Sequence, residues 1–476
     1  MTTQIKADIC VIGGGSGGLS VAAGASQMGA KTVLVEGGKM GGDCLNYGCV
    51  PSKALIAAAK KAASLKNAGE FGVTGPAPIV DFPKVMDHVQ DVIGSIAPHD
   101  SVERFEELGV EVIQGYGRFV SGNELAVGDT RVTARRFVIA TGSTATAPPI
   151  PGLEEAGYLT NETIFENRTQ PDHLIIIGGG PIGLEMAQAH VRLGSKVTVL
   201  EAFKAFGRDD PDLSAIVLKT LREEGIDIRE GVKISDVKKD TEGAYHISLG
   251  EGATVEILSG SHLLVAAGRK ANVDGLNLEV AGVEYSPKGV TVDARLRSTN
   301  KKIYAIGDVA GSYQFTHIAG YHAGIFIRNA LFRLPAKVDY SAVPWVTYTD
   351  PELANVGLSE TVAREQYGDK IKVLTFSFAD IDRARTERET EGMIKVITTN
   401  KGKILGAGIV GPHAGELIHP WGVAITGKLK IGTMASYIAP YPTLGEISKR
   451  AAGSYYTPSL FSSRTRMIVK FLSLFG

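Results

Sequence analysis

The chain has 476 residues, of which 44% are hydrophobic and 58 are glycine. Its formal net charge of −1 excludes a strong overall attraction to nucleic acid or to an anionic membrane. Three cysteines are too few for a disulfide scaffold, and no apolar run reaches the roughly 18 residues of a transmembrane helix. We expect a cytoplasmic α/β protein of several domains, in which a disulfide would be catalytic rather than structural.

The first predicted unit is a buried strand over residues 7–12, a glycine-rich turn, an Ala-rich helix and a second strand over 31–36. The turn has the pattern G-x-G-x-x-G, with its glycines at Gly13, Gly15 and Gly18. In dinucleotide-binding folds these glycines permit the tight turn, the approach of a pyrophosphate and the packing of helix on strand. Glu36 ends the second strand, where a carboxylate accepts hydrogen bonds from ribose hydroxyls. The motif alone is weak evidence, but here all parts of the unit occur in order.

Residues 41–53, with the sequence GGDCLNYGCVPSK, contain Cys44 and Cys49. A helical composition follows Cys49, and a proline is tolerated in the first helical turn. Both sulfurs should therefore lie at or just before a helix N-terminus, where N–H groups and the helix dipole lower the pKa of a thiol. We interpret the pair as a redox-active dithiol or disulfide, the alternative being two unpaired core cysteines. Cys10, within the first strand, is predicted to be a core residue.

A second unit of the same kind follows a Pro-rich linker over residues 144–152. It has strands over 173–177 and 196–201, the second of which ends in Glu201. Its motif contains Gly178, Gly180, Ile182 and Gly183. Two dinucleotide sites predict two dinucleotides, FAD and a nicotinamide cofactor. Glu201 favours NAD over NADP because a carboxylate repels a 2′-phosphate, although Lys204 and Arg208 lie nearby.

The segment 41–53 resembles the redox-active disulfide segment of the flavin-dependent pyridine nucleotide–disulfide oxidoreductases, which include dihydrolipoamide dehydrogenase, glutathione reductase and mercuric reductase. The resemblance runs from about residue 5 to about residue 450. It implies an α/β fold with two Rossmann-like doubly wound domains and a C-terminal α+β dimerisation domain, and therefore a homodimer. The implied domains are an FAD-binding domain in two parts, 1–150 and 272–343, an inserted NAD(P)-binding domain, 151–271, and a dimerisation domain, 344–476. Strands are predicted in the last domain at 344–348, 393–399 and 404–410, and a solvated loop at 380–391.

The resemblance also implies cofactor contacts outside the two glycine motifs. Those implied for FAD are Gly117 beside the adenine, Thr141 and Gly142 at a closing turn, Asp308 on the ribityl chain, and Thr316 and His317 at a helix start near the flavin. Those implied for the nicotinamide domain are Gly268 and Arg269. No metal site is predicted.

The resemblance further assigns catalytic roles. Cys49 is the implied thiol that contacts the flavin and forms the charge-transfer thiolate, and Cys44 is the one that exchanges with substrate. Lys53 lies one helical turn after Cys49, and the family pairs the matching lysine with a glutamate, here Glu185, beside flavin N5. The implied role of this pair is to accommodate charge as hydride arrives.

One catalytic position departs from the disulfide-reducing members. They carry a His in a His-Pro-Thr segment, supplied by the other subunit and oriented by a Glu five residues on; here the His position is Tyr441, while Glu446 matches. A phenol titrates near 10 and an imidazole near 6.5, so Tyr441 is a poor base at neutral pH. General acid–base assistance is worth about 10²–10⁴ in rate. We therefore expect weak turnover with dihydrolipoamide or glutathione disulfide, unless His413 or His419 substitutes.

The leading hypothesis is an enzyme that passes electrons from NADH through flavin to an acceptor other than a simple disulfide: a quinone, a metal ion or a partner's redox centre. A dihydrolipoamide dehydrogenase is the first alternative. A mercuric-reductase-like metal reductase is the second; such enzymes resemble the Tyr441 pattern but carry a C-terminal cysteine pair, and this chain has no cysteine after Cys49. A redox-sensing or electron-transfer partner protein is the alternative from another class.

The segment 462–476 mixes basic and apolar residues and extends past the usual end of the family. The favoured interpretation is a terminal helix that docks on the dimer. The alternative is an amphipathic helix that contacts a membrane or a partner, which would place the protein at the inner face of the membrane.

Overall fold

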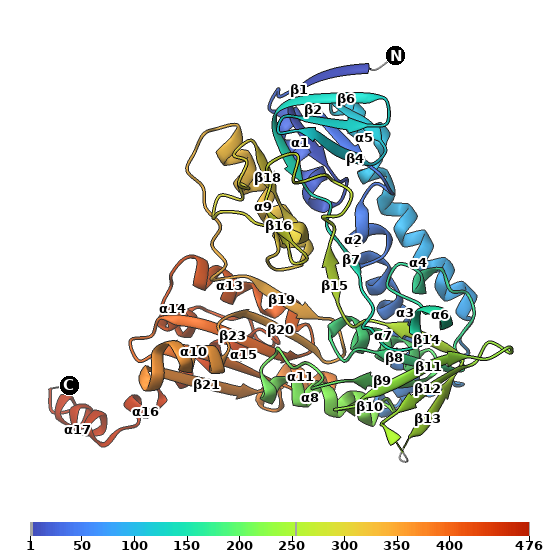
Figure 1. Cartoon of the computed structure of the whole chain (residues 1–476). Coiled ribbons are helices and arrows are strands. Elements are labelled where there is room, and N and C mark those ends of the chain that lie inside the picture. The colour runs from blue at the N-terminus through green and yellow to red at the C-terminus, as the bar shows by residue number, and fades with distance from the viewer. Residues whose placement is uncertain (1–2, 253–254, 476) are drawn as a thin grey trace. The chain divides into compact units, whose positions relative to one another are not determined.

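A computed structural model describes residues 3–252 and 255–475 of the chain (Figure 1). Residues 1–2 and 253–254, within the predicted FAD and nicotinamide domains, and Gly476 of the predicted tail lie outside the described residues. The internal contacts divide the chain into two units: unit 1 is Met1–Ala202 with Asp227–Val338, and unit 2 is Phe203–Ile226 with Asp339–Gly476. The predicted domain boundaries at residues 150, 271 and 343 stay predictions.

The first sheet of unit 1 carries the first glycine motif. Its strand order is β3-β2-β1-β6-β5-β4, with β18 also paired to β6. Strands β3, β2, β1, β6 and β18 are parallel, and β4 and β5 are antiparallel. The strands are β1 (Thr3–Ile12), β2 (Thr32–Glu36), β3 (Val110–Gln114), β4 (Gly117–Ser121), β5 (Glu124–Val127), β6 (Thr130–Ile139) and β18 (Ile303–Ala305). Because β18 pairs with β6, chain from both sides of the second motif builds this one sheet, as the resemblance implies.

The second glycine motif lies on a separate four-stranded parallel sheet of order β10-β9-β8-β14. Its strands are β8 (His173–Ile177), β9 (Lys196–Glu201), β10 (Asp227–Glu230) and β14 (His262–Val265). The remaining strands of unit 1 are β7 (Ser143–Ala145), β11 (Ile234–Lys239), β12 (Tyr245–Leu249), β13 (Glu256–Gly260), β15 (Arg269–Ala271), β16 (Tyr285–Ser286) and β17 (Gly289–Val290). The nearly all-apolar runs of β8 and β14 are buried, as expected for strands covered on both faces.

Two helices of unit 1 begin directly at the glycine motifs, α1 after Gly15 and α7 after Gly180. Residue 49 opens the long helix α3, which packs against both α4 and α7. The helices of unit 1 are α1 (Ser16–Gln27), α2 (Gly42–Asn46), α3 (Cys49–Asn67), α4 (Phe82–Ile96), α5 (Val102–Glu107), α6 (Leu153–Ala156), α7 (Pro181–Arg192) and α9 (Thr316–Ala330). Helices α1 and α9 share one hydrophobic cluster with the first sheet, which includes Leu19, Val138 and Phe326.

Unit 2 is built on a five-stranded antiparallel sheet of order β19-β20-β23-β22-β21. Its strands are β19 (Pro344–Thr347), β20 (Glu352–Gly357), β21 (Ile371–Ser377), β22 (Met393–Thr399) and β23 (Ile404–Gly411). Its helices are α8 (Pro211–Glu223), α10 (Glu360–Tyr367), α11 (Asp382–Glu387), α12 (Ala414–Leu417), α13 (His419–Thr426), α14 (Ile431–Ser436), α15 (Glu446–Ser454), α16 (Thr457–Leu460) and α17 (Ser463–Leu472). The three predicted strands are confirmed.

The charged run at 380–391 was expected to be a loop only, and that expectation is wrong in its middle. Residues Asp382–Glu387 form α11, because Arg383 and Glu387 pair one turn apart and Ala384 packs into the core. The core of unit 2 is centred on Trp421, whose indole N–H donates to the Ser448 hydroxyl at 3.0 Å. Within the described ranges, no helix has the length and apolar character needed to cross a membrane.

Candidate active site

The two glycine loops of unit 1 share one backbone geometry. Gly13 and Gly178 have φ angles of +109° and +117°, which side-chain-bearing residues rarely adopt. A Cβ on Gly18 would lie 1.8 Å from the carbonyl oxygen of Gly13, and one on Gly183 would lie 2.1 Å from that of Gly178. The first and third glycines of each motif are therefore required by the protein's own packing.

Packing within the protein does not require a glycine at the middle position of either motif. A Cβ on Gly15 would meet nothing nearer than Gly42 Cα at 3.8 Å, and a Cβ on Gly180 would have no other atom within 4 Å. Both positions lie immediately before a helix N-terminus, where exposed N–H groups favour a phosphate. The open space beside each loop fits the close approach of a pyrophosphate, which is the role the sequence predicts for these glycines.

Each loop holds a carboxylate at the end of its second strand. Glu36 accepts hydrogen bonds from the backbone N–H groups of Gly14 and Gly38. Glu201 accepts one from the N–H of Gly179 at 2.7 Å. Both carboxylates are thereby fixed beside the loops, at the position from which an acidic residue binds ribose hydroxyls in this type of fold.

The cysteine segment is attached to the first glycine loop. Gly41 donates from its N–H to the Gly14 carbonyl at 2.9 Å. Gly41 and Gly42 have φ angles of +86° and +61°, and a Cβ on Gly42 would lie 2.7 Å from Gly15 Cα. Asn46 closes the turn by donating to the carbonyls of Met40 and Gly42 at 3.0 and 2.9 Å. The paired glycines before the cysteines are therefore needed for the chain to pass so close to the loop.

Cys44 lies in the short helix α2, and Cys49 is the first residue of α3. A hydrogen bond joins the two sulfurs, and Cys49 Sγ lies 3.5 Å from the Thr316 hydroxyl at the start of α9. Both are free thiols, so the disulfide expected between them is not formed in this structure. The fold nevertheless brings the two predicted cysteines and the predicted Thr316 together.

The two thiols are electrostatically unequal. The hydrogen bond from Cys44, the Thr316 hydroxyl and the Lys53 charge together lower the pKa of Cys49 to about 6, against the opposing effect of burial. The same hydrogen bond, together with burial, raises the pKa of Cys44. A thiolate therefore forms first on Cys49. Cys10 is fully buried in β1, and burial raises its pKa, in agreement with a core role.

Lys53 and Glu185 form the predicted pair. The Lys53 ammonium on α3 lies 2.8 Å from a carboxylate oxygen of Glu185 on α7. The glutamate side chain is 6% exposed and the lysine 35% exposed, so the pair points outward from a buried anion to an accessible cation. A cation held in this way can stabilise negative charge that develops beside it.

A polar network around the cysteine loop was not predicted as such. Asp43 accepts from the Asn161 amide at 2.9 Å and lies 3.1 Å from the Arg269 guanidinium. Arg269 donates to the Ser143 hydroxyl at 2.8 Å, and that hydroxyl donates to Asp308 at 2.6 Å. Arg269 and Asp308 could be found from motifs. Asn161 carries no sequence signal, because it reaches the loop only through the fold.

The other predicted cofactor positions occupy several places in unit 1. Thr141 exchanges hydrogen bonds with Asn272, at 2.7 and 2.9 Å, and Gly142 has a φ of +69°. His317 stacks on Phe315, with ring centroids 5.1 Å apart. The three remaining positions are Gly117 at the start of β4, Ile182, which is exposed in the first turn of α7, and Gly268, whose carbonyl accepts from the Thr146 N–H.

Tyr441 and Glu446 belong to unit 2. The Tyr441 phenol is 70% exposed and donates to Asp382 on α11 at 3.1 Å. The hydrogen bond to Asp382 raises the pKa of Tyr441, which keeps the phenol protonated and makes it a still poorer base. Asp382 was not selected from the sequence, since it lies 59 residues away in the charged run.

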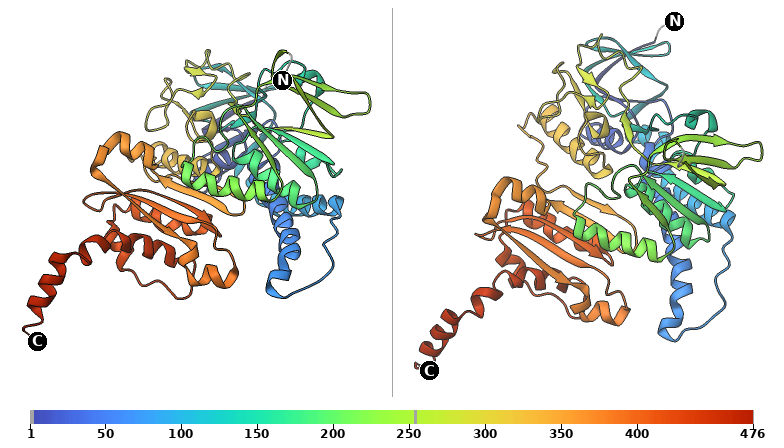
Figure 2. Two further views of the ribbon diagram at one scale, coloured as in Figure 1. Left: turned by 90° about the horizontal axis from the view of Figure 1, so that it is seen from below. Right: turned by 60° about the horizontal axis from the view of Figure 1, so that its bottom comes forward.

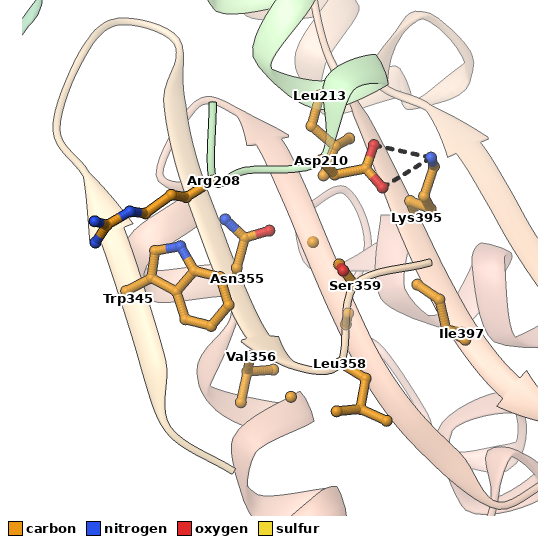
Figure 3. Close-up of a pocket in the computed structure, with 13 residues that line it drawn as sticks. Arg208, Asp210, Leu213, Trp345, Asn355, Val356, Leu358, Ser359, Lys395 and Ile397 are labelled. Carbon is orange, nitrogen blue, oxygen red and sulfur yellow. Dashed lines mark hydrogen bonds and ion pairs between the residues drawn. The ribbon is translucent and has the colours of Figure 1, made fainter. Parts of the chain in front are cut away.

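Unit 2 also contains a cavity of about 20 Å³, with Arg208, Trp345 and Asn355 along its wall (Figure 3). This volume suits a single water rather than a substrate. The buried ammonium of Lys395 lies beside it, 2.9 Å from Asp210, 2.6 Å from Asp212 and 3.2 Å from Glu360. These contacts join α8 and α10 to β22, so we assign this cluster to the structure of unit 2.

Comparison with known proteins identifies the family. The model of the pyridine nucleotide-disulphide oxidoreductases matches residues 7–323, and the model of their dimerisation domain matches residues 343–452. The chain belongs to the pyridine nucleotide-disulphide oxidoreductase family. These two matches confirm the resemblance drawn from the sequence.

Named relatives in this family include two kinds of enzyme. The mercuric reductase of Streptomyces lividans is 37% identical, over 94% of this chain and 96% of that protein. The dihydrolipoyl dehydrogenase of Bacillus subtilis (strain 168) is 32% identical, over 92% of this chain and 96% of that protein. Among solved structures, the Cu(II) complex of the HOCl-induced flavoprotein disulfide reductase RclA from Escherichia coli aligns with a TM-score of 0.84 and 27% identity, over 94% of this chain and 99% of that one.

Proposed function

We propose that this flavoprotein oxidoreductase uses NADH to reduce a thiol-binding metal ion at Cys44 and Cys49. Bound FAD would supply the transfer of two electrons from the nicotinamide to the thiol pair. The balance is one Hg(II) reduced to Hg(0), or two Cu(II) reduced to Cu(I), for each NADH oxidised, with one proton released. Soft ions of this kind prefer thiolate ligands.

Two observations carry this proposal: the unequal thiol pair, and a tyrosine at the position where the family's disulfide reductases carry a histidine base. A thiolate on Cys49 can bind a metal ion directly, and Cys44 becomes a second ligand when the ion displaces its proton. Disulfide exchange instead needs a group that accepts and returns a proton near neutral pH. The raised pKa of Tyr441 makes that residue unsuited to the task.

Two of the relatives support a metal ion as the acceptor, and a third supports lipoamide. One is a mercuric reductase, and the solved complex of RclA contains Cu(II). Dihydrolipoyl dehydrogenase is a relative of similar coverage, so lipoamide is the matched alternative acceptor. Quinones and partner proteins remain the other acceptors that the sequence allows.

We assign the further roles by residue. Lys53, held by Glu185, would stabilise negative charge beside the flavin, and Thr316 would hold the Cys49 thiolate. Glu201 would accept the ribose hydroxyls of NADH and disfavour the 2′-phosphate of NADPH. The dimerisation domain supports a homodimer, in which Tyr441 and Glu446 would serve the partner's site.

The test is steady-state oxidation of NADH by the purified FAD-loaded protein, with Hg(II), Cu(II), lipoamide and a soluble quinone as separate acceptors. We expect turnover with a metal ion and at least 100-fold less with lipoamide. The variants Cys44→Ser and Cys49→Ser should lose metal reduction, whereas Cys10→Ala is the matched control that leaves it intact. Lipoamide turnover equal to that of the metal ions, or fast quinone reduction by the Cys44→Ser variant, would refute the proposal.

A second experiment isolates the role of Tyr441. Tyr441→His should raise lipoamide turnover, because imidazole titrates near neutral pH and phenol does not. Tyr441→Phe is the control, and it should leave lipoamide turnover low. An unchanged rate in Tyr441→His would mean that something other than the missing base limits disulfide exchange.

A further inference from the structure

The last helix of unit 2, α17, exposes nearly all of its apolar side chains. Met467, Ile468, Val469, Phe471, Leu472, Leu474 and Phe475, in and just after α17, are 48–76% exposed. None of the described residues of α17 is buried. Both views of Figure 2 show α17 reaching outward from the sheet of unit 2. The described residues of α17 therefore do not bury their apolar side chains against unit 2.

Local interactions nevertheless stabilise α17 as a helix. The Ser462 hydroxyl caps it by accepting from the N–H of Thr465 at 3.2 Å, and the Thr465 hydroxyl donates back to the Ser459 carbonyl at 2.7 Å. Lys470 in the last turn favours the negative end of the helix dipole. These features form a helix before any partner covers it.

The side chains of α17 divide into two faces at 100° per residue. Arg466 and Lys470, one turn apart, lie between Ser463 and Ser473 on the polar face. Met467, Ile468, Phe471, Leu472 and Phe475 fall on the opposite arc, and Val469 is the apolar residue of α17 that lies outside it, between Thr465 and Ser473. The Phe471 and Phe475 rings contact each other, with centroids 5.2 Å apart. Arg464 is the one cation on the apolar arc, and its position in the first turn lets its long side chain reach outward.

The charge of this segment is one-sided. No aspartate or glutamate follows Glu446, whereas Arg464, Arg466 and Lys470 all lie in α17. Packing two copies by their apolar arcs would bring the two Arg464 side chains together and would leave Arg466 and Lys470 of each copy without an anionic partner in the segment, which disfavours a second copy of α17 as the occupant. An anionic surface matches both the positive charge and the apolar face.

We propose that α17 docks on an anionic lipid surface, with its axis in the plane of the interface. The apolar arc would enter the boundary between headgroups and acyl chains, while Arg466 and Lys470 would remain among the anionic headgroups. A helix of ten residues is too short to span a bilayer. The surface is thus a docking site for a membrane, and it does not depend on which acceptor the active site uses.

The test is co-sedimentation of the FAD-loaded protein with vesicles of phosphatidylcholine containing 30% phosphatidylglycerol. We expect binding that falls about 30-fold in the double variant Arg466→Gln/Lys470→Gln, since each cation near such a surface contributes roughly a factor of five. Binding should also weaken in high salt and on vesicles of phosphatidylcholine alone. A chain ending at residue 461 should not bind, and its oxidation of NADH should be unchanged.

Two matched control variants distinguish binding through α17 from nonspecific adsorption to vesicles. Lys401→Gln/Lys403→Gln removes the same charge from exposed positions elsewhere in unit 2, and Ile79→Ser removes an apolar side chain that is 98% exposed in unit 1. Both should bind vesicles like the wild type. Absence of vesicle binding by the wild type, equal loss in the controls, or dissociation of the oligomer on removal of 462–476 would overturn the proposal.

Discussion

The two glycine loops of unit 1 are nearly the same structure, yet they differ in what lies against them. In both, the first and third glycines are forced by packing, and a glutamate ends the second strand beside the loop. A Cβ on Gly15 would lie 3.8 Å from Gly42 in the cysteine segment, whereas a Cβ on Gly180 would meet, beyond its chain neighbours, no described atom within 4 Å. We infer that the shared geometry serves binding of a dinucleotide at both loops, and that the added segment serves chemistry at the first loop.

The largest effect should come from the third glycine. Gly18→Ala and Gly183→Ala each place a Cβ about 2 Å from a carbonyl oxygen, so each should cost more than about 3 kcal/mol of folding free energy. We expect Gly18→Ala to lose bound FAD and Gly183→Ala to retain FAD while losing NADH binding. Thermal unfolding and the flavin absorbance of the purified variants measure both. Equal loss of FAD in the two variants would show that the loops do not act independently.

The middle glycine should behave in the opposite way. Gly15→Ala and Gly180→Ala meet no protein atom closer than 3.8 Å, so the unfolding free energy should change by less than about 1 kcal/mol. Cofactor affinity should fall at least tenfold, because the added methyl group occupies the space of a pyrophosphate. For Gly180→Ala the readout is the KM for NADH with ferricyanide as acceptor. Unchanged affinity would mean that the phosphates lie elsewhere.

The glutamates test which loop takes which nucleotide. Glu201→Gln should lower the preference for NADH over NADPH about tenfold, since it removes a charged acceptor and its repulsion of a 2′-phosphate. Glu36→Gln, the matched change in the other loop, should leave that preference unchanged. The ratio of kcat/KM for the two reductants is the measurement. A wild-type preference for NADPH would contradict the assignment of Glu201.

The smallest predicted effect is a shift in the pH dependence of Cys49 alkylation. Cys49 lies in the cysteine segment, which contacts the first glycine loop. In the reduced protein, alkylation of Cys49 by iodoacetamide should rise with pH through a midpoint of about 6, because the thiolate is the reactive form. Cys44→Ala removes the hydrogen bond that lowers this pKa, so the midpoint should move to higher pH. Mass-spectrometric counting of modified Cys49 follows the change, and Cys10→Ala is the control. A midpoint that does not move would exclude Cys44 as the main cause.

Much of unit 1 could be predicted because its constraints are local. A glycine with positive φ, a buried apolar strand and a helix start each leave a mark in a few consecutive residues, so both loops and the Cys44–Cys49 segment could be found. The charged run at 380–391 was predicted less well. Its composition suits a loop, but α11 forms there because Ala384 packs into the core, a contact that the local sequence does not show.

The sequence alone was thus enough to indicate the family, the two glycine loops and the cysteine pair, since each rests on short motifs with a steric or electrostatic reason. The tertiary structure supplied the physical reason why Cys49, the thiolate that the resemblance implies, ionises first. The hydrogen bond from Cys44 and the hydroxyl of Thr316, which lies 267 residues away, both lower its pKa. The tertiary structure also decided the partners of Asp43 and Tyr441, and that α17 remains uncovered within its own unit. Such outcomes depend on distances between segments remote in the chain, and spacing along a sequence does not encode them.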